Sequence, residues 1–363
     1  MEVINATIFI VFFFSLMAVM SKQKENKPNI IFVVIIIIIL GLVSGLRTAM
    51  GDTVYYVHSY KLIGEELDSN IDENISENKT TDETYEKGWV DLNKFLNSIS
   101  RDPQFMLLVT SFIIVTFTIL TLRKYASLFE LQTFLYITCG TYMVSMNGIR
   151  QCVAASILFW AVRFIVKGKF IPYCIVVLFL MNLHESAFIM IPIYFIVRLE
   201  AWHKKTIKIL GIGFVFVMLY GKLAPLLSSV MQDSGYSGYL QNPEEGANIL
   251  RVVIAAVPVI LSYAYKDDLK DNWNECDAFI NMSIINLIFM SLATYNWIFA
   301  RFTLYFELYN VVLLPYIIKS IPNIKEKRII YYTAVVCYAL YFILESRTSD
   351  YYTPYISIHN IFL

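Results

Sequence analysis

An arginine and a glutamine directly precede a long apolar segment in the run SMNGIRQCVAAS, residues 145–156. Arg150 carries a permanent cation, and Gln151 carries an amide that both donates and accepts hydrogen bonds. An arginine at the centre of a bilayer costs roughly 2.5–3.5 kcal/mol on insertion scales. Arg150 therefore either lies at a water interface without a further role or is held there to bind an anionic group.

Three other segments place polar groups beside apolar stretches. Arg47 and Asp52 lie in GLRTAMGDTVYY, His184 and Ser186 lie in NLHESAF, and Arg301 lies in ARFTLYFELY. Guanidinium groups bind phosphate oxygens in bidentate fashion, and an imidazole accepts a proton near neutral pH. Each residue also has an ordinary alternative: an arginine whose charge reaches the interface, an Arg47–Asp52 ion pair, or a histidine that is hydrogen-bonded within the packing.

The elements that must position these groups are membrane helices. Hydrophobic residues make up 57% of the 363 residues, charged residues make up 16%, and the mean hydropathy is +0.58. A soluble protein has about 25% charged residues. Residues 29–46 contain no charge and have the length of a spanning helix. We therefore expect an all-α, polytopic integral membrane protein in which residues 1–363 form a single membrane domain.

The hydropathy pattern predicts about twelve transmembrane helices. The predicted spans are 3–20, 29–46, 104–122, 127–146, 150–166, 169–183, 186–199, 206–222, 248–265, 278–297, 301–318 and 328–344. The sixth and seventh are short, which is typical of tilted or broken spans or of a re-entrant pair near His184. Between the spans we expect an extracytoplasmic loop at 47–103, with interfacial helices in its flanks, and a second one at 223–247.

The Lys and Arg residues of the short loops fall mostly on one side when the predicted spans alternate, and basic residues favour the cytoplasmic side. This distribution predicts that both termini are extracytoplasmic. It also places Arg47, Arg150, His184 and Arg301 at the extracytoplasmic ends of their spans. Tyrosines near that face, among them Tyr236 and Tyr239, suit sugar rings, although an interfacial aromatic belt explains them equally well.

Several cations at one end of a helical bundle favour a diphosphate ligand, and the neighbouring apolar spans suit its lipid tail. The formal net charge is zero, which gives no reason to expect nucleic acid as a partner. The five cysteines are scattered, without a CxxC or a His/Cys spacing for zinc. We therefore expect no metal and no cofactor.

Six motifs together resemble the EpsG-like branch of the Wzy-type O-antigen and exopolysaccharide repeat-unit polymerases. They are GLRTAMGDTVYY (45–56), YEKGWVDLNKFL (85–96), NGIRQCVAASIL (147–158), NLHESAFIMIPIYF (182–195), GYSGYL (235–240) and ARFTLYFELY (300–309). Each motif is common by itself, but their order and spacing extend over nearly the whole chain. The chain departs from the pattern at Trp89, where a smaller aromatic is expected, and in the long acidic insertion before it.

The resemblance implies a membrane-embedded architecture similar to the GT-C-type glycosyltransferases. It also implies a polymerase at the outer face of the bacterial cytoplasmic membrane, which uses undecaprenyl-diphosphate-linked oligosaccharide as donor and acceptor in O-antigen, capsule or exopolysaccharide assembly. Such a reaction would need no metal. A chain-length regulator is an expected partner beside the lipid bilayer.

Roles for individual residues follow from this reaction. Arg150 and Arg301 would bind the diphosphate, with Arg47 as a third ligand, because cations placed at a leaving group lower the barrier most. His184 is the first choice for the base and Asp52 the second. Gln151 and Ser186 would contact sugar hydroxyls. The alternatives are a flippase or transporter of the lipid-linked oligosaccharide, a glycan ligase, and a membrane O-acyltransferase.

Overall fold

A computed structural model describes residues 2–21, 27–68, 86–209, 211–213, 215, 217–219 and 246–348. The regular structure in these residues is helical, as expected for an all-α chain. The chain divides into two compact units. Unit 1 consists of Met1–Arg163, Phe170–Met190 and Thr333–Leu363, and unit 2 consists of Phe164–Lys169 and Ile191–Tyr332. Each unit has apolar helices of its own, and the expectation of a single membrane domain stays a prediction.

Five of the described helices are long and apolar enough to cross a membrane. They are α1 (Glu2–Met20), α5 (Pro103–Lys124), α8 (Ile149–Val166), α15 (Cys276–Ala293) and α18 (Ile324–Thr348). A sixth span is formed if α13 (Ile249–Ala264) and α14 (Lys266–Asn272), which are bent by 81° at their junction, count as one. The protein is therefore a membrane protein, and the count of about twelve spans stays a prediction.

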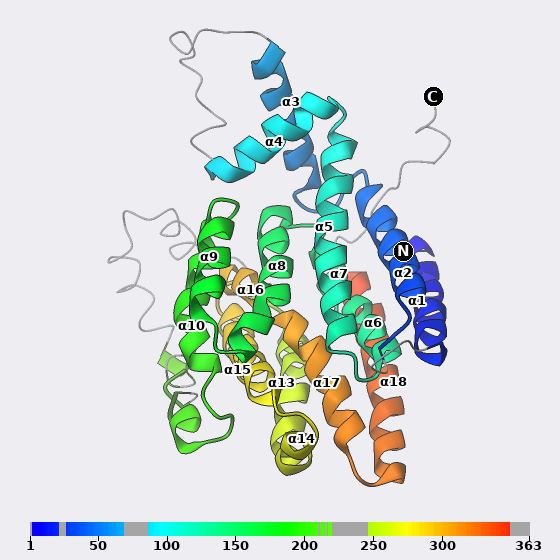
Figure 1. Cartoon of the computed structure of the whole chain (residues 1–363), viewed down its shortest axis with the longest axis vertical. Coiled ribbons are helices and arrows are strands. Elements are labelled where there is room, and N and C mark those ends of the chain that lie inside the picture. The colour runs from blue at the N-terminus through cyan, green and yellow to red at the C-terminus, as the bar shows by residue number, and fades with distance from the viewer. Residues whose placement is uncertain are drawn as a thin grey trace. The chain divides into compact units, whose positions relative to one another are not determined.

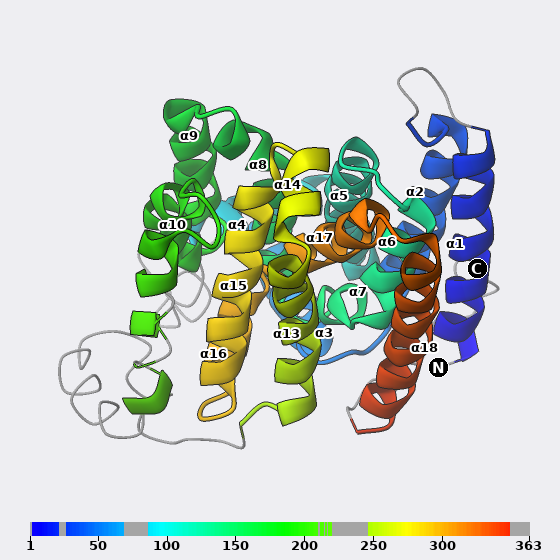
Figure 2. The ribbon, with the colours of Figure 1, turned by 90° about the horizontal axis from the view of Figure 1, so that it is seen from below.

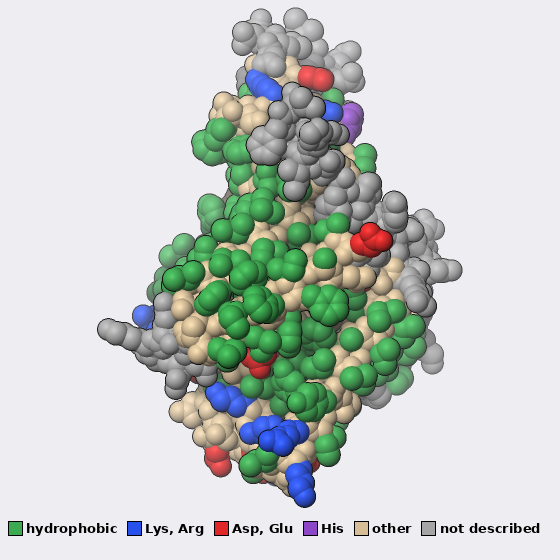
Figure 3. Space-filling view, turned by 90° about the vertical axis from the view of Figure 1, so that its right-hand side faces the viewer, with side chains coloured by type: hydrophobic (Ala, Val, Ile, Leu, Met, Phe, Trp, Pro, Cys, Tyr) green, Lys and Arg blue, Asp and Glu red, His purple; other side chains and the backbone are tan. Residues whose placement is uncertain are grey.

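Shorter apolar helices add to these spans. They are α2 (Ile30–Gly45), α9 (Phe170–Met181) and the segment Glu185–Val197, which comprises the 3-10 helix η2 (Glu185–Ile189) and α10 (Met190–Val197). Many large apolar side chains on α1 and on these shorter helices are exposed, including Phe9 of α1 and Ile171 and Phe179 of α9. On the face in Figure 3, hydrophobic side chains cover most of the central described surface, as a lipid-facing surface requires.

In unit 1, α1 packs against α2 and α2 packs against α5, and Figure 2 shows α1 and α2 side by side. Hydroxyl groups join these apolar helices. Ser44 Oγ and Ser111 Oγ lie 2.9 Å apart between α2 and α5, and Ser15 Oγ and Thr133 Oγ1 lie 2.8 Å apart between α1 and α6 (Phe129–Thr138). Hydrogen bonds of this kind satisfy polar groups where water is excluded.

The prediction of one span over 127–146 is wrong. The segment forms α6 and the short α7 (Thr141–Val144), and the chain turns between them at Gly140, whose φ is 91°. Glycine adopts this left-handed conformation without the Cβ clash of other residues. Every residue of α6 is buried, so protein covers this part of the broken segment. Irregular backbone inside a membrane needs such cover, because lipid cannot form hydrogen bonds with its free N–H and C=O groups.

The flanks of the predicted 47–103 loop form the helices α3 (Thr53–Asp68) and α4 (Lys87–Ile99), and their interfacial, extracytoplasmic position stays a prediction. In Figure 1 these helices pack against each other beside one end of α5. Tyr60 Oη donates a hydrogen bond to Ser100 O at 2.8 Å, and Asn97 Nδ2 donates to Tyr60 O at 3.1 Å. Residues 69–85 of this loop, and most of the predicted 223–247 loop, lie outside the described residues.

In unit 2, α13, α15 and α17 (Glu307–Ser320) pack against one another, and Figure 2 shows α13 beside α15. Trp273 stacks on Tyr316 with ring centroids 3.8 Å apart and also contacts Phe279. The predicted span 301–318 begins later than expected. Turn residues separate α16 (Ile298–Thr303) from α17, and Arg301 lies on the shorter helix.

Candidate functional site

A single carboxylate in unit 1 joins three segments that are far apart in the sequence. Glu86 Oε2 accepts a hydrogen bond from Arg150 Nη1, and the two side chains form an ion pair. Its other oxygen, Oε1, lies 3.0 Å from His184 Nδ1 and accepts a hydrogen bond of 3.0 Å from the Glu185 backbone N–H. Two of the residues that the sequence pointed to, Arg150 and His184, are therefore neighbours through a third residue that it did not.

Glu86 is the N-cap residue of α4, and its side chain does not cap that helix. Serine, threonine, aspartate and asparagine are the residues that normally accept from the first N–H groups of a helix, and the longer glutamate fits this task poorly. The Glu86 carboxylate is instead committed to Arg150 and His184. A helix terminus that is capped suboptimally in this way indicates that the side chain serves the contact and not the helix.

Helix ends position the two partners of Glu86. Arg150 is the second residue of α8. His184 follows the end of α9, its backbone N–H donates to Leu180 O at 2.9 Å, and its extended backbone (φ −158°) precedes η2. The apolar helices α8 and α9 thus carry Arg150 and His184 at their ends, where both side chains contact Glu86.

Gly88 allows the start of α4 to approach the turn after α9. A Cβ atom at Gly88 would lie 2.7 Å from Asn182 O and 2.8 Å from Asn182 Cβ. A backbone oxygen cannot move away without displacing the turn that carries His184. The absence of a side chain at Gly88 is therefore part of the way in which Glu86 reaches His184.

Two buried aromatic side chains, Tyr56 and Trp89, lie beside this site. Tyr56 of α3 packs edge-on against Trp89 of α4, with ring centroids 5.7 Å apart, and both are buried. Burial raises the pKa of Tyr56 above its usual value, while the neighbouring Arg150 acts in the opposite direction. The Tyr56 hydroxyl therefore stays protonated beside the Arg150 cation and remains a hydrogen-bond donor.

The electrostatics of Glu86 decide its protonation state. Burial alone would raise its pKa, but the hydrogen bond from His184, the Arg150 charge and the Glu185 N–H together lower the pKa of Glu86 to about 2. The carboxylate is anionic at neutral pH and only accepts hydrogen bonds. His184 Nδ1 is therefore the donor in this contact, which leaves Nε2 as the position of the lone pair in the neutral tautomer. This is the tautomer that a general base requires.

The side chains of Arg150, Glu86 and His184 are 18%, 20% and 16% exposed. This partial exposure lets a bound molecule contact them, whereas fully buried groups would serve the packing alone. A guanidinium has several N–H donors, so Arg150 can contact both Glu86 and an anionic ligand. The arrangement combines a cation for an anion, a base, and a carboxylate that orients both.

The pKa of Glu86 makes a pH-dependent contribution to stability. A carboxyl group whose folded pKa is lower than its unfolded pKa stabilises the fold above the unfolded pKa and loses this effect as the pH falls. For Glu86 the loss extends from pH 4.5 down to about 2. The shift corresponds to roughly 3 kcal/mol at most, at about 1.4 kcal/mol per pKa unit.

This contribution can be measured by thermal unfolding in detergent. The unchanged protein should unfold at a higher temperature than Glu86→Gln, by a constant amount from pH 7 to pH 5, and this difference should shrink below pH 4.5. An equal difference at pH 7 and pH 3 would contradict the assigned ion pair.

Arg47 is buried, with 1% of its surface exposed, and has different neighbours from Arg150. Its guanidinium donates to Ser44 O at 2.6 Å, Thr53 Oγ1 at 3.0 Å and Ser111 Oγ at 3.3 Å. It thereby ties the end of α2 to the start of α3 and to α5. The contacts indicate a structural role for this guanidinium, and its role as a diphosphate ligand stays a prediction.

Asp52 lies just before α3, and its backbone N–H donates to Asn147 Oδ1 at 2.8 Å. This contact links the turn after α2 to the turn before α8. Gln151 is buried next to Arg150 on α8, and Ser186 is half-buried in η2 beside His184. All three residues belong to unit 1, and their proposed contacts with substrate stay predictions.

Arg301 belongs to unit 2, where its guanidinium carbon lies 5.1 Å from the centre of the Trp297 ring. A cation–π contact of this kind holds an arginine side chain in place without neutralising it. Tyr236 and Tyr239 lie outside the described residues. Within the ranges that the structure describes, no group of three or more His, Cys, Asp or Glu residues could hold a metal ion.

Sequence reasoning missed Glu86 although it lies in one of the six motifs, YEKGWVDLNKFL. The signal that could have identified it is a carboxylate at the start of an aromatic, amphipathic helix. This signal is weak, because many other Asp and Glu residues precede Glu86 in the same loop. Only the contacts with Arg150 and His184 distinguish Glu86 from those neighbours.

No curated protein and no solved structure matches the chain. The model of the EpsG family matches residues 30–357, which include all the residues of the Glu86 site. The chain therefore belongs to the EpsG family.

Proposed function

We propose that this protein is a polysaccharide polymerase that acts on lipid-linked glycans in the membrane. The observation that supports this function most directly is the Glu86 carboxylate shared by Arg150 and His184, in a chain of the EpsG family. The donor is a growing glycan on undecaprenyl diphosphate, and the acceptor is a lipid-linked repeat unit. The reaction takes place at the extracytoplasmic face of the cytoplasmic membrane, as the distribution of Lys and Arg predicts.

The chemical step is a glycosyl transfer. A hydroxyl oxygen at the non-reducing end of the acceptor attacks the anomeric carbon at the reducing end of the donor glycan. The bond between this carbon and the diphosphate oxygen breaks, and undecaprenyl diphosphate leaves with the electron pair. The acceptor hydroxyl loses its proton to a base, which gives one new glycosidic bond for each repeat unit added.

The residues of the site divide this work. His184 Nε2 takes the proton of the acceptor hydroxyl, and Glu86 holds the imidazole in the required tautomer and stabilises the imidazolium that forms. Arg150 stabilises the charge that develops on the departing diphosphate. Asp52 is the alternative base, Arg301 and Arg47 are further diphosphate ligands, and Gln151 and Ser186 contact sugar hydroxyls.

Deletion of the gene tests the function at the level of the product. We expect the ladder of surface polysaccharide on a gel to collapse to a single repeat unit, because each unit is still made and exported but no longer joined. Restoring the intact gene should restore the ladder. Loss of the lipid-linked unit from the outer face would instead indicate a flippase, and long chains that stay on the lipid carrier would indicate a ligase.

A further inference from the structure

A second polar site lies in unit 2, in a pocket of about 240 Å³. Its walls are the turn Glu200–His203 after α10, the helix α14 and the first turn of α15. The apolar helices α10 and α15 have their ends here, and α14 bends away from the apolar α13 by 81°. The pocket is therefore at the level where the apolar helices stop, which is the depth of lipid headgroups.

Hydrogen bonds to the backbone hold the turn that forms one wall of this pocket. Asp277 Oδ1 accepts from the Ala201 N–H at 2.9 Å, and Asn281 Nδ2 donates to Leu199 O at 2.7 Å. Thr206 Oγ1 donates to Glu200 O at 2.6 Å. These contacts from α15 and from the chain after the turn hold it in a defined shape, including Trp202 at a φ of 62°.

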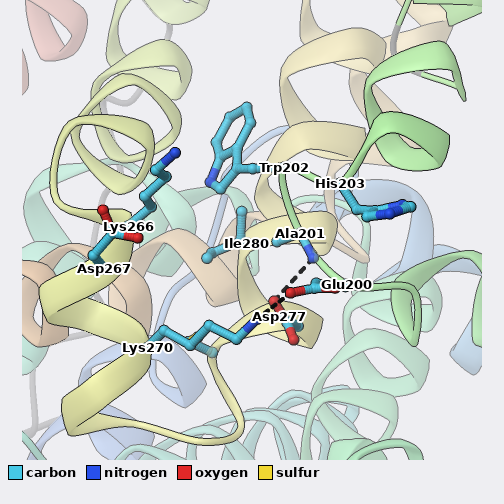
Figure 4. Close-up of a pocket in the computed structure, with 10 residues that line it drawn as sticks. Glu200, Ala201, Trp202, His203, Lys266, Asp267, Lys270, Asp277 and Ile280 are labelled. Atoms are coloured by element: carbon cyan, nitrogen blue, oxygen red, sulfur yellow. Dashed lines mark hydrogen bonds and ion pairs between the residues drawn. The ribbon is translucent and has the colours of Figure 1, made fainter.

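Trp202 places a hydrogen-bond donor in the pocket. Its indole packs edge-on against Tyr263 with ring centroids 5.1 Å apart, and Lys266 Nζ lies 5.6 Å from the same Tyr263 ring. The Nε1 atom of Trp202 is buried, and no acceptor among the described residues lies within hydrogen-bond distance. Figure 4 shows this nitrogen and the Lys266 ammonium on the same side of the pocket. A buried N–H group calls for an acceptor, which a ligand oxygen would supply.

The charges around the pocket specify the ligand further. Lys270 and Glu200 form an ion pair and neutralise each other. The other charged groups of the lining are the Lys266 ammonium and the carboxylates of Asp267 and Asp277. In Figure 4 the Asp277 and Glu200 carboxylates lie together, away from Trp202 and Lys266. A ligand that carried only negative charge would be repelled by the carboxylates, whereas one with both a phosphate and an ammonium group would match both ends.

We propose that this pocket binds a phosphoethanolamine group, presented by a phospholipid of the leaflet at this face. Trp202 Nε1–H and Lys266 bind the phosphate, and the carboxylate of Asp277 binds the ammonium. The site is separate from the Glu86 site and takes no part in glycosyl transfer. Its occupant would hold α14 and the turn after α10 at the membrane surface.

Native mass spectrometry of the purified full-length protein in detergent tests this proposal. The probes are phosphatidylethanolamine, phosphatidylglycerol and diacylglycerol with the same acyl chains, with soluble phosphoethanolamine and inorganic phosphate as competitors. We expect retention of phosphatidylethanolamine above both other lipids and displacement by phosphoethanolamine but not by phosphate. Retention should fall about fivefold in Trp202→Phe, which keeps the ring and removes the N–H, and in Lys266→Gln.

Lys204→Gln, which changes an exposed lysine after the same turn, is the matched control and should retain the lipid as the unchanged protein does. Equal retention of the three lipids would overturn the proposal, as would a preference for phosphatidylglycerol or full retention in both pocket variants. If inorganic phosphate displaces phosphatidylethanolamine and phosphoethanolamine does not, the pocket binds a free phosphate and not a lipid, which would also overturn the proposal.

Discussion

Replacing Arg150 with alanine is expected to abolish polymer formation while the protein remains inserted in the membrane. The reaction that we propose builds negative charge on a departing diphosphate, and a preorganised cation lowers that barrier. Loss of one such donor typically reduces the rate by about 100- to 1,000-fold. The substitution also removes the ion-pair partner of the partly buried Glu86, which adds to the effect on the site. The measurement is the rate of polymer formation by the purified protein from lipid-linked repeat units.

Arg150→Lys separates charge from geometry. Lysine keeps the positive charge but lacks the planar fork that binds two phosphate oxygens, so partial activity is expected. Lys61→Ala serves as a control, because Lys61 is an exposed cation on α3 of the same unit. Polymer of normal length and yield from Arg150→Ala would rule out the assignment of the donor site to Arg150.

Replacing Glu86 with glutamine is expected to slow the transfer by about 100-fold or more, close to the effect of replacing His184 with glutamine. The amide has only one acceptor oxygen, and the Arg150 guanidinium requires an acceptor. The amide NH₂ group of glutamine would then face His184 Nδ1 and donate to it. The imidazole proton would move to Nε2, which removes the lone pair that accepts the proton of the acceptor hydroxyl.

Because Glu86 acts through His184, the test needs a measurement that a purely structural role would not change. The turnover rate should fall in Glu86→Gln while binding of the acceptor stays near its original affinity, since the interaction is required in the transition state. The double variant of Glu86 and His184 should be no slower than the His184 variant alone, because both changes remove the same base. Glu185→Gln is the matched control, since only the backbone of Glu185 contacts Glu86 in the hydrogen bonds described above. Additive losses in the double variant would show that Glu86 does not act through His184.

The amino-acid sequence alone determined the class of the protein and most of its helices. Long apolar segments such as α1 and α5 were predictable because hydrophobic length decides whether a segment spans a bilayer. The same reasoning was wrong at 127–146, where the chain turns at Gly140 into a second short helix. Hydropathy cannot detect such a turn, since buried residues are apolar whether the helix continues or not.

The sequence also singled out Arg150 and His184 as candidates, because a permanent cation and an imidazole beside apolar segments are costly unless they have partners or a function. Only the tertiary structure revealed that both contact Glu86, and that Arg47 is instead hydrogen-bonded to Ser44, Thr53 and Ser111. Residue type and hydropathy indicate where along the chain a polar group lies at a membrane boundary. Which of these groups share a hydrogen bond depends on helix packing and on close approaches such as that of Gly88 to Asn182, and these are properties of the folded chain.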